Sequence, residues 1–310
     1  MTSKIVVALG SVQSKIVQPI LGPHINFIEN PSSNDLTEAS GAIVRANYHC
    51  DQALFEKMPN LKVIARTGVG VELVDLIEAD RRKIMVLTTP GANSKAVAEG
   101  AFAHILALSK RLQPLTKLVR EDNWNQKESY PVGDLSGETL GVIGYGRIGK
   151  IMVNLAHAFE MKTIVFDPNV EIPMDLRGDL DTLYSQSDYI SLHIPYSAEN
   201  SQLINQSSIK LMKDGVILVN CSRGGLINLD DALAALLTGK VGGIGLDAFE
   251  NEPPEHHPIF DHENAVLTPH LMGLSRKSTV ATYQMAAQGV RDVLEDKNLK
   301  SITNLRVRGS

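Results

Sequence analysis

The sequence contains very little cysteine. Cys50 and Cys221 are the only two cysteines in 310 residues, which excludes the disulfide framework that stabilises many small secreted domains. No apolar run is long enough to span a membrane, and residues 1–10 lack the apolar stretch and cleavage site of a secretory signal. We therefore expect a protein of a reducing compartment, with a cytoplasmic location and no membrane contact.

An excess of charge of one sign is also absent. The chain carries 30 Lys and Arg against 35 Asp and Glu, a formal net charge of -5 at pH 7, with the two signs interspersed. A nucleic-acid surface needs clustered basic residues, so we expect no nucleic-acid partner. We assign no metal site either, and we expect a small molecule as the ligand.

Short apolar, β-branched runs recur along the chain, separated by segments with helical patterns. Runs that are apolar throughout are typical of strands buried on both faces of a parallel sheet under helices. Two separate series of alternating strands and helices predict an α/β fold with two doubly wound parallel sheets. The first series comprises residues 4–9, 41–45, 61–66 and 84–89, and the second comprises 140–144, 162–167, 189–193, 216–220, 242–249 and 265–269. Predicted helices include residues 94–112, 229–239 and 274–296, and the last of these can return the chain to the first unit.

The stretch LGVIGYGRIG at residues 140–149 places Gly144, Gly146 and Gly149 directly after an apolar strand and at the start of a helical pattern. In a dinucleotide-binding turn the first glycine permits the turn, the second lets a pyrophosphate approach, and the third lets helix and strand pack closely. The helix N-terminus also attracts that anion. Asp167 ends the next strand, where a carboxylate can bind the adenosine ribose and repel a 2′-phosphate. The pattern predicts NAD as the cofactor, with a purely structural glycine turn as the alternative.

Arg223, Glu252 and His270 each follow one of the last three strands of the second series. Because the carboxyl ends of parallel strands meet at one edge of a sheet, we expect these side chains near the glycine turn. A histidine can protonate the oxygen of a ketone that receives a hydride, and a carboxylate beside it favours the protonated imidazole and orients the ring. An arginine can bind a substrate carboxylate through two parallel hydrogen bonds. This combination predicts reversible reduction of a 2-keto acid to a 2-hydroxy acid, although Glu250 is an equal candidate for the carboxylate and Arg223 can instead bind cofactor phosphates.

Five longer stretches extend these motifs: TPGANSKAVAEGAFAHIL, TLGVIGYGRIG, LVNCSRGGLIN, GIGLDAFENEPP and TPHLMG. In order and spacing they resemble the D-isomer-specific 2-hydroxyacid dehydrogenase family. The resemblance implies Arg223, Glu252 and His270 as the catalytic set, with Glu252 rather than Glu250 as the partner of His270, the general acid and base. It also implies NAD contacts at Val97, Arg147, Ile148, His193, Ile194, Pro195, Cys221, Asp247 and Gly273.

The resemblance further implies the domain organisation. A discontinuous, flavodoxin-like substrate-binding domain is formed by residues 1–95 and 280–310, and a Rossmann-like NAD-binding domain, residues 96–279, is inserted between them. The helix at residues 94–112 is implied to take part in a two-fold homodimer. Because few residues follow the last predicted helix, we expect no appended regulatory domain.

Arg45 and Arg66 end two strands of the first series, and Val69 and Gly70 follow in a glycine-containing loop. The resemblance implies that this loop binds the substrate carboxylate. The arginine pair resembles the phosphoglycerate dehydrogenase branch, where arginines bind a phosphate, so we favour 3-phosphoglycerate or another anionic hydroxy acid. Glyoxylate or hydroxypyruvate reduction and D-lactate-type activity stay open, as does pairing of both arginines with acids of their own domain. An NAD-sensing regulator of the corepressor kind is the alternative of another class, and formate oxidation fits the residues around Glu252 less well.

Overall fold

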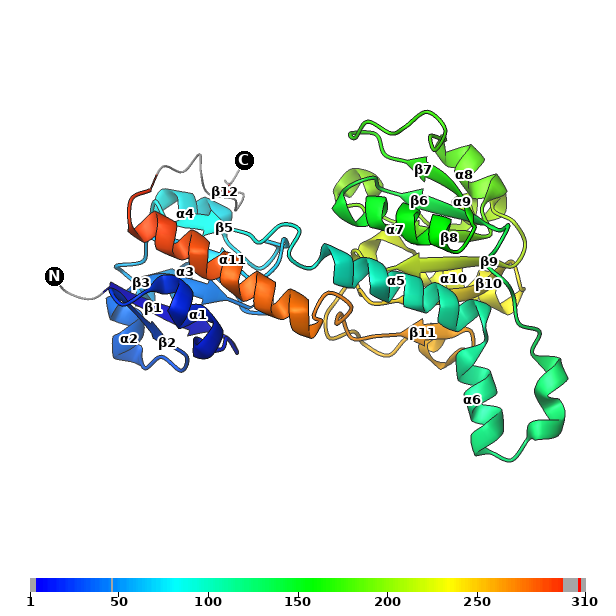
Figure 1. Ribbon diagram of the computed structural model, residues 1–310, viewed down its shortest axis with the longest axis horizontal. Helices are drawn as coiled ribbons and strands as arrows, with labels where there is room; N and C mark the ends of the chain where they lie inside the picture. Colours follow the sequence, from blue (N-terminus) through cyan, green and yellow to red (C-terminus); the bar gives the residue numbers. More distant parts are fainter. Residues whose placement is uncertain (1–3, 46, 298–305, 308–310) are drawn as a thin grey trace. The chain divides into compact units, whose positions relative to one another are not determined.

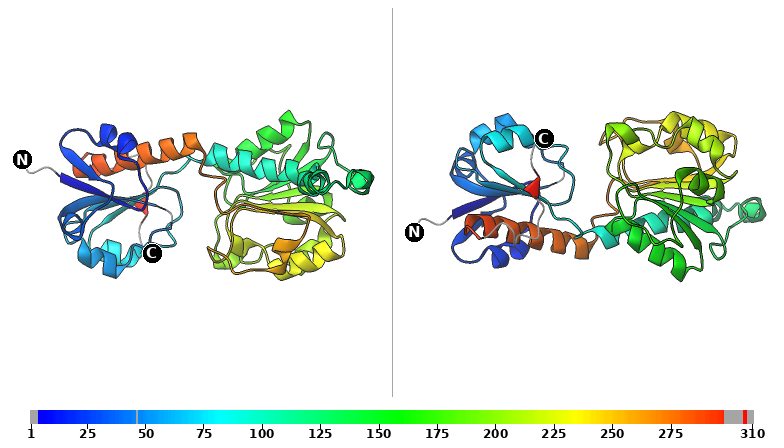
Figure 2. Two further views of the ribbon diagram at one scale, coloured as in Figure 1. Left: turned by 90° about the horizontal axis from the view of Figure 1, so that it is seen from below. Right: turned by 90° about the horizontal axis from the view of Figure 1, so that it is seen from above.

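The computed structural model describes residues 4–45, 47–297 and 306–307. The chain divides into two compact units, unit 1 from Met1–Asn93 with Ser275–Ser310 and unit 2 from Ser94–Leu274. Each unit holds one sheet between two layers of helices (Figure 1 and Figure 2), so the predicted pair of doubly wound sheets is confirmed. The sequence predicts divisions after residues 95 and 279, whereas the two units divide after Asn93 and Leu274. The sequence predicts that residues 280–310 complete the first unit, and of these residues 298–305 and 308–310 lie outside the described residues.

In unit 1 the strand order is β12-β5-β4-β3-β1-β2, and all neighbouring strands are parallel except β12 and β5. The same order, with the first strand between the second and third, is typical of flavodoxin-like sheets. The strands are β1 Lys4–Leu9, β2 Ile25–Ile28, β3 Ala39–Val44, β4 Val63–Arg66, β5 Met85–Leu87 and β12 Arg306–Val307. The helices are α1 Ser14–Leu21, α2 Ser33–Glu38, α3 Gln52–Lys57, α4 Leu76–Arg81 and α11 Arg276–Leu294.

In unit 2 the strand order is β11-β10-β9-β8-β6-β7, and all of these neighbours are parallel. The strands are β6 Thr139–Ile143, β7 Lys162–Phe166, β8 Tyr189–Leu192, β9 Val216–Asn220, β10 Val241–Leu246 and β11 Ala265–Leu267. The α-helices are α5 Ser94–Ser109, α6 Leu112–Arg120, α7 Arg147–Ala158, α8 Leu180–Gln186, α9 Gln206–Leu211 and α10 Leu229–Leu237. Short 3₁₀ helices are η1 Trp124–Ser129, η2 Ala198–Asn200, η3 Gly224–Leu226 and η4 Pro258–Asp261.

Each sheet is buried on both faces, as its uniformly apolar strands predicted. Side chains alternate between the two faces of a strand, so Val6 of β1 packs with Tyr283 of α11 on one face, and Val7 packs with Phe55 of α3 on the other. In unit 2, α5 and α7 cover one face and α8, α9 and α10 cover the other. No described helix is long and apolar enough to cross a membrane.

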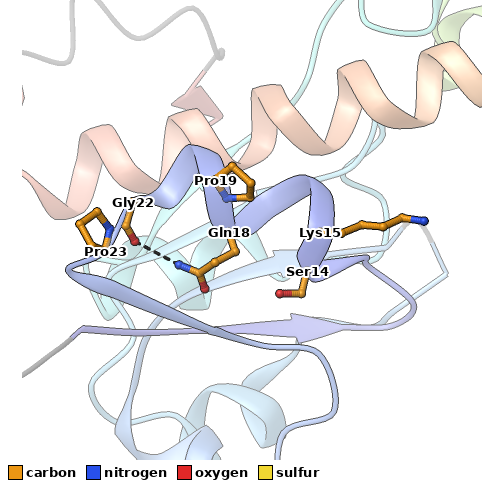
Figure 3. A pocket seen from close by; sticks show the side chains of 6 residues that line it. All are labelled: Ser14, Lys15, Gln18, Pro19, Gly22 and Pro23. Carbon is orange, nitrogen blue, oxygen red and sulfur yellow. Dashed lines mark hydrogen bonds between the residues drawn. The ribbon is translucent and has the colours of Figure 1, made fainter.

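Strand β2 was not among the predicted strands, because its four residues form no long apolar run. A side chain from the preceding helix organises it instead. The amide of Gln18 in α1 donates to the carbonyl oxygens of Gly22 (3.0 Å) and Ile25 (2.8 Å), and its oxygen accepts from the Phe27 N–H (3.0 Å). Figure 3 shows the bond to Gly22 within a shallow surface pocket. Strand β2 is therefore held both by its parallel pairing with β1 and by a polar side chain from the preceding helix.

The helix predicted at residues 94–112 is interrupted in the structure, so its predicted end was wrong. Helix α5 ends at Ser109, and Arg111 adopts a left-handed backbone conformation with φ 52° before α6 begins. The apolar periodicity runs on past residue 109, so the pattern alone predicts one continuous helix. Pro114, in the first turn of α6, is the residue that signals a new helix start. The predicted helix at 229–239 begins as expected, because the Asn228 side chain caps it by accepting from the Asp231 N–H.

Candidate active site

The glycine turn after β6 has the geometry of a dinucleotide-binding turn. Gly144 has φ 104°, a left-handed conformation that glycine adopts without strain, and an added Cβ there would lie 2.5 Å from the carbonyl oxygen of His193. An added Cβ at Gly149 would collide with the carbonyl oxygen of Gly144, so helix and turn are in backbone contact. At Gly146, by contrast, an added Cβ meets nothing within 4 Å. The middle glycine therefore leaves room for a ligand to approach the backbone.

Helix α7 begins immediately after this turn. Its N-cap residue is Gly146, and no side chain caps the first turn. Arg147 is exposed and Ile148 half-buried at this helix start. Uncapped N–H groups and the positive end of the helix dipole favour an anion such as a pyrophosphate. The turn and the helix N-terminus thus fit the phosphates of NAD.

Asp167 lies beside the glycine turn, directly after β7. Its Oδ2 accepts from the Tyr145 N–H (2.7 Å), and its Oδ1 accepts from the N–H groups of Asn169 (2.8 Å) and Val170 (3.1 Å). These bonds fix the orientation of the carboxylate and link the turn to the loop after β7. A carboxylate has about four acceptor positions, so Asp167 retains capacity for a ribose hydroxyl.

His193, Ile194 and Pro195 follow β8, on the other side of β6 from Asp167. The turn contacts them directly, since the Cγ2 atom of Ile194 also lies 2.9 Å from an added Cβ at Gly144. The His193 ring exchanges a hydrogen bond with the Ser191 hydroxyl through Nε2 (2.8 Å). Within the described structure its buried Nδ1 has no partner, and burial lowers the pKa of this imidazole to about 3.

Val97 of α5 and Cys221 after β9 belong to one buried cluster of unit 2. Burial, with a smaller contribution from Asp247, raises the pKa of the Cys221 thiol. A nucleophilic cysteine needs a stabilised thiolate, so Cys221 is a packing residue here. The NAD contacts that the family resemblance implies for these two residues stay a prediction.

The loop after β9 presents Arg223. Asn220, fully buried at the end of the strand, shapes this loop: its amide donates to the Arg223 carbonyl oxygen (2.7 Å) and its oxygen accepts from the Ser222 N–H (3.0 Å). An added Cβ at Gly224 would collide with the backbone between Phe249 and Glu250. The loop that carries Arg223 therefore packs backbone against backbone on the loop after β10.

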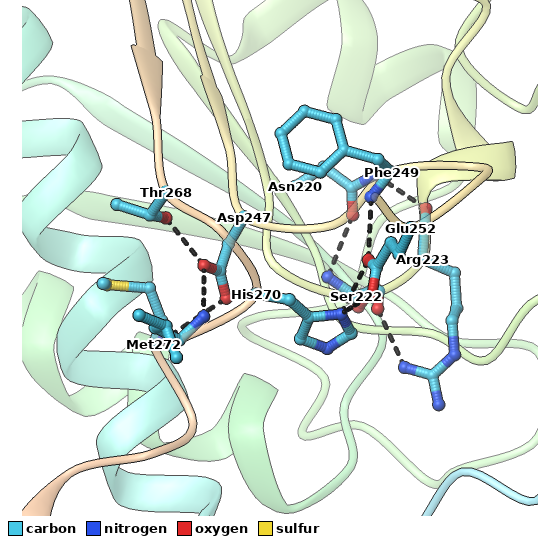
Figure 4. A network of polar contacts seen from close by, with 10 residues as sticks. Asn220, Ser222, Arg223, Asp247, Phe249, Glu252, Thr268, His270 and Met272 are labelled. Atoms are coloured by element: carbon cyan, nitrogen blue, oxygen red, sulfur yellow. Dashed lines mark hydrogen bonds and ion pairs between the residues drawn. The ribbon is translucent and has the colours of Figure 1, made fainter. Parts of the chain in front are cut away.

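Glu252 on that loop after β10 contacts His270 on the loop after β11. The His270 Nδ1 lies 2.7 Å from Oε1 and 2.8 Å from Oε2 of Glu252, and the Phe249 N–H also donates to Oε1 (3.1 Å). Because a carboxylate only accepts, Nδ1 carries the proton of this bond. The side chains of His270 and Glu252 are 45% and 39% exposed. Figure 4 shows Arg223 extending from the same edge of the sheet.

Asp247 is 2% exposed, at the end of β10. Its Oδ1 accepts from the Thr268 hydroxyl (2.6 Å) and the Leu271 N–H (2.9 Å), and its Oδ2 accepts from the Met272 N–H (3.1 Å). The predicted cofactor contact Asp247 is thus already engaged by the loop that carries His270, and Gly273 lies buried on the same loop.

The predicted substrate residues of unit 1 lie at the carboxyl edge of its sheet. Arg66 is 4% exposed, and its guanidinium donates to the carbonyl oxygens of Arg45 (2.6 Å) and Gly70 (3.1 Å). Arg45 is half-buried and donates to the Tyr283 hydroxyl (3.2 Å). Val69 is exposed. Arg66 therefore orders the loop at residues 66–70, while Arg45 is the more accessible of the two cations.

Among the described residues, no group of His, Cys, Asp or Glu has the arrangement of a metal site.

A comparison with known families identifies the family of this chain. Residues 102–272, more than half of the chain, match the model of the NAD-binding domain of the D-isomer specific 2-hydroxyacid dehydrogenases. The chain belongs to this family. As a member of the D-isomer specific 2-hydroxyacid dehydrogenases, it is an NAD-dependent oxidoreductase, and the glycine turn, the α7 N-terminus and Asp167 are the residues that fit NAD.

Similar proteins of this dehydrogenase family carry several different names. A hydroxypyruvate reductase of Thermotoga maritima is 39% identical over 242 residues, which cover 76% of this chain and 78% of that protein. A D-3-phosphoglycerate dehydrogenase of Bacillus subtilis is 36% identical over 291 residues, which cover 90% of this chain and 54% of that protein. The chain thus spans about half the length of the D-3-phosphoglycerate dehydrogenases that it matches.

A D-lactate dehydrogenase of Aquifex aeolicus, solved with NAD and lactic acid, is 30% identical to this dehydrogenase, with a TM-score of 0.82 and coverage of 99% and 100% of the two chains. The family fold therefore extends over both units.

Sequence reasoning passed over four polar residues close to this edge: Asn220, Ser222 and His104, which are buried, and Thr268, which is half-buried. Each stands next to an apolar run or within an apolar helix face. A polar residue in such a position needs a partner, and that requirement was the available signal.

Proposed function

We propose that this dehydrogenase interconverts a D-2-hydroxy acid and its 2-keto acid, with His270 as the general acid and base, Glu252 as its orienting partner and Arg223 as the ligand of the substrate carboxylate. The observation that carries the proposal is the bond from the His270 Nδ1 to both oxygens of Glu252. That bond leaves Nε2 as the nitrogen available to a substrate.

The chain's residues divide the reaction between them. When bound, NADH would supply a hydride, one proton with two electrons, to the keto carbon. His270 donates the Nε2 proton to the keto oxygen as negative charge develops there, and Glu252 stabilises the imidazolium before transfer. Arg223 binds the carboxylate and holds the keto group in position through parallel hydrogen bonds. The products are the 2-hydroxy acid and NAD, and the reverse reaction uses His270 as the base.

For the substrate we favour a small 2-keto acid such as hydroxypyruvate or glyoxylate. Arg66, one of the two expected phosphate ligands, is buried and donates to two carbonyl oxygens, which weakens the support for a two-arginine phosphate site. The similar proteins include a hydroxypyruvate reductase and a glyoxylate reductase, of which this chain covers 78% and 76%. 3-Phosphoglycerate is the second candidate, because half-buried Arg45 has further N–H groups besides the one bound to Tyr283.

The test is NADH oxidation with a panel of hydroxypyruvate, glyoxylate, pyruvate and 3-phosphohydroxypyruvate, followed by absorbance. Turnover of any of them supports the enzyme, and the highest kcat/KM names the substrate class. NADH binding without turnover of any keto acid would instead support the NAD-sensing regulator. An Arg45→Gln variant separates the two candidates, because it lowers kcat/KM selectively for the phosphorylated acid only if Arg45 binds the phosphate.

We also propose a homodimer, through the segment that follows α5. Helix α5 itself is mostly buried within unit 2. The projecting segment of α6 and η1 (Figure 1), in contrast, exposes Leu112, Val119 and Trp124, and Val132 is exposed just after it. Several exposed apolar side chains on one projecting segment favour an interaction surface. Light scattering after size-exclusion chromatography should give a dimer for the native chain and a monomer for a Val119→Asp/Trp124→Ser variant.

A cytoplasmic location remains a proposal. It is supported by the thiol state of Cys50 and Cys221, which are both buried and not joined in a disulfide. Cell fractionation with an antibody to the chain tests it.

A further inference from the structure

His104 is a polar side chain on the buried face of α5. It is 3% exposed, and its ring packs against β10, where Gly245 leaves room for it: an added Cβ at Gly245 would lie 2.7 Å from the His104 Nδ1. Its Nε2 lies 3.1 Å from the Thr268 hydroxyl oxygen. The role of this buried histidine is not accounted for by cofactor binding or proton transfer.

Counting protons assigns the direction of each bond. Asp247 accepts the single hydroxyl proton of Thr268 at 2.6 Å, because a carboxylate has no proton to give. The Thr268 oxygen must then accept from His104, so the proton of the His104 ring is on Nε2. The unprotonated Nδ1 has no hydrogen-bond partner in the described structure and faces Gly245. Burial lowers the pKa of His104, against a smaller opposing effect of Asp247, which agrees with a neutral ring.

The other end of this chain of bonds reaches the loop that carries His270. Asp247 accepts the N–H groups of Leu271 and Met272, the two residues after His270. His270 itself has φ 52°, a left-handed conformation that a non-glycine residue adopts only when its surroundings hold it. Figure 4 shows Asp247 between Thr268 and the amide groups after His270.

We infer that His104 is a positioning residue for the proposed proton donor. It acts through Thr268 and Asp247, which together hold the strained backbone at His270 so that the imidazole meets Glu252. This inference rests on the proposed function of His270. It assigns to α5 a role in turnover besides its packing in unit 2, and it predicts that the neutral Nε2–H form of His104 is required.

Two pairs of variants test this relay of hydrogen bonds from His104 through Thr268 to Asp247. The measurement is steady-state kinetics with NADH and the best keto acid of the panel. His104→Leu removes the donor, and His104→Gln restores an amide N–H at the same distance along the side chain. Thr268→Val removes the hydroxyl, and Thr268→Ser restores it. We expect His104→Leu and Thr268→Val to lower kcat about 10- to 100-fold, because small misplacements of a reacting group cost this much. The Gln and Ser variants recover most of the rate, and the affinity for NADH is unchanged throughout.

Ser109→Ala is the matched control. Ser109 ends the same helix, is buried, and accepts a hydrogen bond from the Tyr189 hydroxyl (3.1 Å) away from His270. The Ser109→Ala variant therefore loses a buried hydrogen bond of the same kind, and we expect this variant to keep the native kcat. Equal loss of kcat in Ser109→Ala, or native kcat in both His104→Leu and Thr268→Val, would overturn the inference.

Nitrogen NMR of ¹⁵N-histidine-labelled protein gives a readout that is independent of turnover. A proton on the Nε2 of His104, assigned by its loss in His104→Gln, supports the relay, and a proton on Nδ1 overturns it. A native chain that turns over no keto acid would refute the proposed function. The tautomer of His104 would still decide whether its Nε2–H donates to Thr268. Thermal unfolding of each variant shows whether the fold is kept, and Thr268→Val decides the kinetic test if His104→Leu does not fold.

Discussion

The Nδ1 of His270 lies within 2.8 Å of both carboxylate oxygens of Glu252, although the two residues stand on loops from different strands. The Phe249 N–H holds the same carboxylate from within its own loop. Glu252 is therefore fixed before it meets the imidazole, and the pair presents Nε2 outward in a defined direction.

Replacing His270 with Ala should lower turnover by about 10²- to 10⁴-fold, the usual contribution of a positioned acid or base. The affinity for NADH, measured by fluorescence, should be retained because the glycine turn is untouched. Glu252→Gln keeps a hydrogen-bonding side chain but removes the charge, and we expect an intermediate loss of kcat. Native turnover in His270→Ala would remove this residue from the proton-transfer role.

Replacing Arg223 with Lys should raise KM for the keto acid about 10- to 100-fold, because an ammonium cannot form the two parallel bonds of a guanidinium. The measurement is the dependence of initial rate on keto-acid concentration at saturating NADH. The affinity for NADH serves as the control. A selective loss of NADH affinity would show that Arg223 binds the cofactor phosphates instead.

Replacing Asp167 with Ser should weaken the preference for NAD over NADP by about tenfold or more, since one like charge near a phosphate is worth about 1 to 4 kcal/mol at 4 Å. The ratio of kcat/KM for the two cofactors is the quantity to compare. Asp167 also accepts three backbone N–H groups, so Asp167→Asn, which keeps an acceptor oxygen, controls for a disturbed loop. An unchanged ratio in both variants would refute the ribose role.

The two thiols should be unreactive in the folded protein near neutral pH. Burial raises the pKa of Cys50 to about 11, with Arg66 partly opposing the shift, and it also raises the pKa of Cys221. The thiolate is the reactive form, so at pH 8, below both values, each thiol stays protonated. A soluble aromatic disulfide reagent should therefore release colour only after unfolding in guanidinium. Release of one equivalent from the folded protein at pH 8 would contradict this expectation.

The sequence predicted the sheets and the edge where the site lies, because these depend on local patterns. An apolar run such as residues 216–220 has to be buried on both faces, and a polar residue that follows it has to emerge at the carboxyl edge. The glycine spacing at residues 144–149 likewise describes one continuous turn. Strand β2 was missed because its four residues form no long apolar run, and pairing with β1 and the Gln18 side chain hold it in place. The break at Arg111 was missed because the apolar periodicity continues across it, although Pro114 in the first turn of α6 signals a new helix start.

What the sequence by itself determined is which residues reach the functional edge: Arg223, Glu252, His270 and the glycine turn. The tertiary structure decided which of them touch. It brought Glu252, the carboxylate that the family resemblance implies, against His270. It also engaged Arg66 with carbonyl oxygens and linked His104 to the loop that carries His270. The physical reason is that the direction of a side chain follows from its own strand or turn. A hydrogen bond between two loops, in contrast, requires the positions of its donor and acceptor atoms to agree within about a few tenths of an ångström. Only the packing of the whole unit sets that agreement.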